Sequence, residues 1–66
     1  MAGGKRGQVK VTLQQAVDHI VQAQEYILRE AEQYKIPHPA HYYSFHAILE
    51  VLEMSINAIE TLKENI

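Results

Sequence analysis

The four histidines are the residues of this chain with the most versatile chemistry. His38, His41 and His46 lie within nine residues of one another, whereas His19 lies nearer the N-terminus. Histidine is the commonest metal ligand, and residues three or four apart lie on one face of a helix. His46 could therefore share a helix face with Glu50. The sequence leaves open a histidine-dependent metal-binding protein that uses His38, His41, His46 and Glu50.

The number and direction of these ligands argue against a metal site in a single chain. A site needs three or four converging ligands. His41 and His46 are five residues apart, which turns them about 140° from each other around a helix. Cysteine is absent, and so is the Glu-x-x-His motif of di-metal centres in helical bundles. The pattern therefore favours solvated histidines and predicts no cofactor.

The sequence contains no set of residues suited to nucleophilic catalysis. There is no cysteine, and Ser44 and Ser55 lack the flanking glycines of a nucleophile elbow. Asp18 and His19 are adjacent in sequence, so they point in different directions on a helix. We therefore expect a protein that is not an enzyme.

The N-terminal residues suggest a different activity. Residues 1–12 contain three basic residues and no acid, whereas residues 13–66 contain eight acids and three bases. Residues 8–13 alternate polar and apolar side chains, as a half-buried strand does. A strand followed by two helices resembles the element order of dimeric ribbon-helix-helix DNA-binding regulators. This alternative assigns DNA contacts to Lys5, Arg6, Gln8, Lys10 and Thr12, although the acidic remainder argues against a nucleic-acid partner.

Two helices must position these groups. Thr12 and Gln15 form a capping box, which predicts a first helix from about residue 13 to residue 34. Gln24 is the one polar residue in its apolar stripe. The glycine-rich residues 1–11 are then predicted to be a flexible basic arm.

Two prolines predict the turn between the helices. Pro37 and Pro39 disfavour the helical conformation in the residue before each of them, so the first helix ends before the turn over residues 35–38. Pro39 suits the first position of a second helix, predicted over about residues 39–63. A turn this short makes the helices antiparallel neighbours, so residues 12–66 are expected to form a helical hairpin. The aromatic residues near this turn, which are predicted to plug the hairpin end, are Tyr34, Tyr42, Tyr43 and Phe45.

The second helix is apolar around most of its circumference. Its polar residues fall on one narrow line, which comprises His46, Glu50, Glu53, Asn57, Glu60 and Glu64. One antiparallel helix can cover only part of the apolar remainder, and a long uncovered apolar patch usually marks an interaction site. The residues predicted to form an oligomer interface are Phe45, Ile48, Leu49, Leu52, Ile56 and Ile59. A second apolar stripe comprises Ala47, Val51, Met54 and Ala58.

These patterns together predict an all-α protein. A chain of 66 residues has a marginal core when alone, so a two-helix hairpin that dimerises into a four-helix bundle is expected. The predicted function is a small non-enzymatic homo-oligomer acting as a protein–protein interaction or regulatory module. A tetramer, or a different protein bound to the second helix, satisfies the same physics. Without an apolar span or a secretory signal, we expect a soluble, cytoplasmic protein with no membrane partner.

Overall fold

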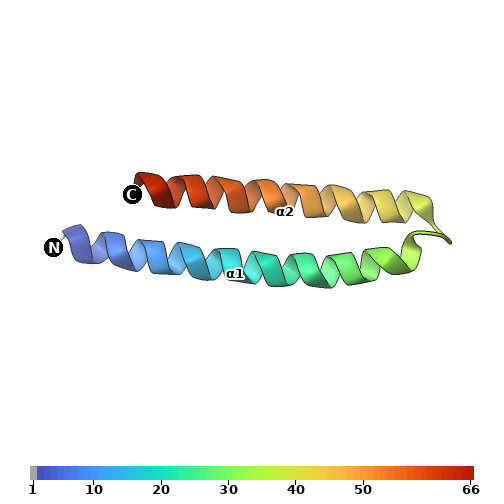
Figure 1. The fold of residues 1–66 in the computed structure, drawn as a ribbon, viewed down its shortest axis with the longest axis horizontal. Coiled ribbons are helices and arrows are strands. Elements are labelled where there is room, and N and C mark those ends of the chain that lie inside the picture. Colours follow the sequence, from blue (N-terminus) through green and yellow to red (C-terminus); the bar gives the residue numbers. More distant parts are fainter. Residues whose placement is uncertain (1) are drawn as a thin grey trace.

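The computed structural model describes residues 2–66 and consists of two long helices joined by a short turn (Figure 1). Helix α1 runs from Ala2 to Tyr34, and helix α2 runs from Pro39 to Asn65. The helices lie side by side and antiparallel, and residues 2–66 contain no strand. The predicted all-α class and helical hairpin are confirmed. The four-helix bundle requires a second chain and stays a prediction.

The turn follows from the two prolines and from the backbone around them. Pro39 occupies the first turn of α2, where its missing N–H costs nothing. The preceding His38 has a non-helical backbone, with φ −143° and ψ 75°. The His38 N–H donates to the Tyr34 carbonyl at 3.0 Å, and the Tyr42 N–H donates to the His38 carbonyl at 3.1 Å. These bonds connect the end of one helix to the start of the next.

Helix α1 begins eleven residues earlier than the sequence predicted. Thr12 lies inside the helix and is not its N-cap, and residues 8–13 are helical, not the strand that the DNA-binding alternative requires. The residues before Thr12 include lysine, arginine and glutamine, which favour helix. Extending an existing helix also adds one hydrogen bond per residue without a new nucleation step. The predicted start at Leu13 and the predicted strand are therefore corrected.

The early start makes α1 longer than α2. Their 33 and 27 residues correspond to lengths of about 50 Å and 40 Å at 1.5 Å per residue. The Gln14–Lys63 hydrogen bond places Val11 about level with Ile66, so residues 2–10, which we call the N-terminal extension, project past the C-terminus of α2 (Figure 1). The stretch predicted as a flexible arm over residues 1–11 is therefore, from Ala2 onward, part of α1.

The core between the helices is thin. Among the described residues, Val17 and Ala31 are the only buried apolar side chains, with exposed fractions of 6% and 0%. Helix α2 contributes no buried residue. The half-buried apolar residues on the two sides of this contact include Leu13, Ala16, Ile20, Ala23 and Ile27 of α1 and Phe45, Leu49, Leu52, Ile56 and Ile59 of α2. Each helix thus packs through one stripe and leaves broad faces open to solvent.

Replacing Ala31 with leucine should destabilise the hairpin. Ala31 is fully covered, so added methylene groups must displace neighbouring side chains, which costs about 1–3 kcal/mol. Urea unfolding followed by circular dichroism measures this loss. Ala47→Leu is the matched control, because Ala47 is exposed on α2. Equal stability of the two variants would contradict the packing described here.

Deleting residues 1–8 should leave the fold intact. Residues 5–8 are exposed and lie past the C-terminus of α2, so their deletion removes no contact between the helices. The free energy of unfolding should change by less than about 0.5 kcal/mol, as for most surface changes. Thermal unfolding of the full and shortened chains tests this. Loss of the folded state in the shortened chain would show that the N-terminal extension is a structural element.

Candidate interaction surface and polar groove

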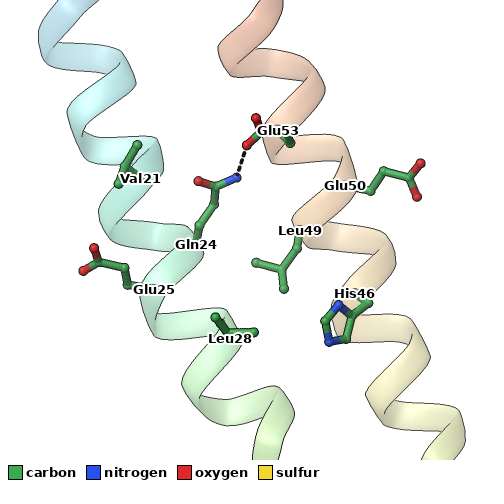
Figure 2. A pocket seen from close by; sticks show the side chains of 8 residues that line it. All are labelled: Val21, Gln24, Glu25, Leu28, His46, Leu49, Glu50 and Glu53. Carbon is green, nitrogen blue, oxygen red and sulfur yellow. Dashed lines mark hydrogen bonds between the residues drawn. The ribbon is translucent and has the colours of Figure 1, made fainter.

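The α2 stripe predicted to form an oligomer interface packs largely within its own chain. Its half-buried members are Phe45, Leu49, Leu52, Ile56 and Ile59. Phe45 stacks on Tyr34 with 5.4 Å between ring centroids, and Leu49 points into the space between the helices (Figure 2). Ile48 differs from the others because 48% of it is exposed. The sequence identified this apolar stripe without showing that α1 would cover most of it.

One flank of α2, which we call the open face, is covered by α1 only in part, because Ser55 and Ile59 are half-buried there and Ile59 also belongs to the stripe that packs on α1. The open face comprises Ser44, Ile48, Val51, Ser55, Ile59 and Leu62, whose spacing places them on one side of the helix. Val51 is 60% exposed and Leu62 is 50% exposed. No member is charged, and the polar line from His46 to Glu64 lies on roughly the opposite side. The open face is therefore an uncharged surface along much of α2.

The other side of the hairpin holds an open groove of about 630 Å³, which we call the polar groove because a side-chain hydrogen bond crosses it, although most of its exposed lining is apolar (Figure 2). It is lined by Val21, Gln24, Glu25 and Leu28 of α1 and by His46, Leu49, Glu50 and Glu53 of α2. The Gln24 Nε2 donates to the Glu53 Oε2 at 3.1 Å across the groove. This bond explains why the apolar stripe of α1 contains one polar residue. Glu25 and Glu50 point away from the groove on its two sides, so its carboxylates do not converge.

The position of the groove indicates which side of α1 lies next to the open face of α2. Val21 and Leu28 border the groove, so the opposite side of α1 lies beside the open face of α2. Ala23 lies on that side, with His19 and Tyr26 exposed one turn away in each direction. Ser44 and Ile48 of α2 likewise share a small pocket with Tyr34 of α1.

Polar contacts near the open end of the hairpin help to fix its register. The Lys63 Nζ donates to the Gln14 Oε1, and Lys63 also pairs with Glu60 at 3.4 Å. The Gln14 Nε2 donates to the Asp18 Oδ1 at 3.0 Å. Lys63 is half-buried, so its aliphatic part also covers the helix contact. These bonds and the Gln24–Glu53 bond hold the two helices in a single register.

Aromatic rings gather at the turn. The Tyr34 ring lies 6.0 Å from His38 and 5.7 Å from His41, and it stacks on Phe45. Tyr42 instead packs against His46, with 4.4 Å between ring centroids. The rings of this cluster cover the end of the thin core next to the turn.

The four residues of the metal hypothesis are not brought together. The rings of His38 and His41 lie 5.4 Å apart beside Tyr34. His46 lines the polar groove, where its Nε2 is buried without a hydrogen-bond partner in the described part of the chain. Glu50 points outward. Across residues 2–66, no group of three histidine or acidic side chains has the arrangement of a metal site, so the metal hypothesis would require ligands from a second chain.

The residues of the DNA-binding alternative lie along one helical segment. All five are exposed, and they comprise Lys5, Arg6, Gln8, Lys10 and Thr12. On a helix, Arg6 and Lys10 share one face, whereas Lys5 and Thr12 share another. The structure therefore keeps Gln8 and Thr12 on one face, whereas Lys10, which the strand reading had placed beside them, lies on another.

Comparisons with models of known families, with curated proteins and with solved structures give no match. Neither helix, within residues 2–66, has a stretch long and apolar enough to cross a membrane.

Metal removal should not change the thermal stability of this protein. A metal that binds only the folded state raises its stability in proportion to RT ln(1 + [L]/Kd). Because the described ligands do not converge, the melting temperature should be the same with a chelator and with stoichiometric zinc. A rise with zinc that disappears in His38→Ala or His41→Ala would instead establish a site shared between chains.

Proposed function

We propose that this chain is a small non-enzymatic homo-oligomer that acts as a protein–protein interaction or regulatory module. Two hairpins would associate through their open faces to form a four-helix bundle. The observation that supports this most strongly is the open face itself. Ile48, Val51 and Leu62 remain about half exposed or more after α1 has packed against α2. Contiguous apolar surface of this kind usually marks an interaction site.

The hairpin exposes more surface than a compact protein of the same mass. The chain exposes 5083 Å², whereas a monomeric globular protein of 7.6 kDa is expected to expose about 4,300 Å². The difference is close to the roughly 800 Å² that each partner buries in an interface of standard size. The projecting N-terminal extension accounts for part of the excess, and the open face supplies apolar area that a partner would cover.

The thin core gives a second reason for assembly. With Val17 and Ala31 as its buried apolar residues, the described hairpin has one line of packing between two helices. Small scaffolds without disulfides or a structural metal generally need another chain to complete their core. The chain has no cysteine, so association is the available means of stabilisation.

The absence of charge from the open face favours a copy of the same chain as the partner. Its six residues are apolar or carry a neutral hydroxyl. A charged partner would gain no ion pair there and would lose solvation of its own charges. Two uncharged faces can pack without that cost. A different protein with a similar apolar face is the competing outcome of the experiment below.

Val51→Glu should dissociate the oligomer. Val51 is exposed in the hairpin, so the substitution leaves the contact between α1 and α2 unchanged, whereas in a dimer it buries an unpaired carboxylate. Light scattering on the native chain should give twice 7.6 kDa, and the variant should give a lower mass. Leu52→Glu or Ile56→Glu should also unfold the chain, because both residues are half-buried against α1.

Asn57→Glu is the matched control for this experiment. Asn57 is an exposed residue of the polar line, two residues beyond Ser55 and on the other side of α2. Its substitution adds the same charge without entering the proposed interface, so the mass should remain that of the native chain. A native chain that is monomeric throughout a dilution series would refute the proposal and indicate a different protein as the partner of the open face.

A further inference from the structure

The apolar residues of the open face are arranged symmetrically about Ser55. Ile48 and Leu62 each lie seven residues from Ser55, on either side of it, and Val51 and Ile59 each lie four residues away. Seven and four residues are close to two turns and one turn, so all of them share a face with Ser55. In two identical antiparallel helices related by a two-fold axis, residues equally distant from the axis on opposite sides meet.

Ser55, at the centre of this pattern, is suited to meeting its own copy at a two-fold axis. Ser55 is small, and the distance between packed helices depends on the side chains where they touch. Its hydroxyl donates to the Val51 carbonyl at 3.0 Å, so it would bring no unsatisfied donor into an interface. A large or charged residue at this position would meet its own copy. A small hydrogen-bonded serine avoids that conflict.

A two-fold axis at Ser55 of α2 would also give acceptable contacts between the α1 helices of the two copies. Two side-chain hydrogen bonds that join the described parts of the helices, Gln24–Glu53 and Gln14–Lys63, connect residues whose numbers add to 77. Ser55 therefore lies level with Gln22 of α1. On the side of α1 next to the open face, His19 and Tyr26 lie at nearly equal distances from this level. The axis that pairs the α2 helices would thus place His19 against Tyr26 of the second copy, without a clash of like charges.

We infer that the open face binds a second copy of this chain in an antiparallel arrangement, with the two-fold axis at Ser55. Ile48 then contacts Leu62 of the second copy, and Val51 contacts Ile59 of the second copy. This inference rests on the proposed homo-oligomer and adds its register and symmetry. The acidic residues of the polar line stay on the far side of each α2, so no carboxylates face one another in the contact.

Single cysteines test this register directly, because the chain has none of its own. Ser55→Cys should give a covalent dimer with a short bis-maleimide cross-linker on a denaturing gel. Ile48→Cys alone should not, because it lies 14 residues, or about 21 Å, from its copy. A mixture of Ile48→Cys and Leu62→Cys should give a cross-linked product. Asn57→Cys is the matched control, because it lies near the level of the axis but on the opposite side of α2.

The outcomes separate this inference from the proposal on which it rests. Light scattering and circular dichroism first establish the mass and helical content of each variant. A dimer that cross-links through Ser55→Cys, and not through Asn57→Cys, supports the register. A dimer without that cross-link, or one in which Ile48→Cys cross-links to itself, overturns the register while leaving the homo-oligomer in place. A helical monomer overturns both.

Discussion

Two packed helices touch along a single line, so they cannot enclose a core as three or more helices can. The other features of this molecule depend on that constraint. Each helix can turn only one stripe toward its neighbour, so Val17 and Ala31 are covered while α2 contributes no buried residue within the described chain. Val51 and Leu62 are not misplaced core residues. They are what a hairpin must leave outside when its second helix is apolar over most of its circumference. A second layer of helices is the physical means of covering them.

Helix α2 divides its circumference into three parts with different roles. One stripe packs on α1, the polar line borders the groove with the Gln24–Glu53 bond, and the open face lies on the opposite flank, while Met54 and its neighbours on the side away from α1 remain exposed. Because α1 lies between the groove and the open face, the hairpin has a polar side and an uncharged side. Association through the uncharged side would complete the core and leave the groove and the N-terminal extension at the surface.

Much of this arrangement could be predicted from the sequence because its signals are local. Pro37 and Pro39 fix the turn, and the spacing of apolar residues indicates both helices. The start of α1 could not be predicted reliably, because the capping signal at Thr12 competes with the extension of a helix that already exists. The partner of Gln24 could not be predicted either. Glu53 is 29 residues away, and only the register of the two helices brings them together.

The sequence could not show which of the two apolar stripes of α2 packs against α1 and which stays exposed. Both stripes have helical periodicity, and only the rotation of α2 about its axis decides which one α1 covers. That rotation depends on non-local contacts such as the stacking of Phe45 on Tyr34 and the Lys63–Gln14 bond. Once that rotation is known, the order of residues along the open face, which lies between the two stripes, predicts how a second copy would meet it. The symmetry of Ile48, Val51, Ile59 and Leu62 about Ser55 depends on position, so a reshuffled stripe of identical composition would bury equal area without matching its own copy.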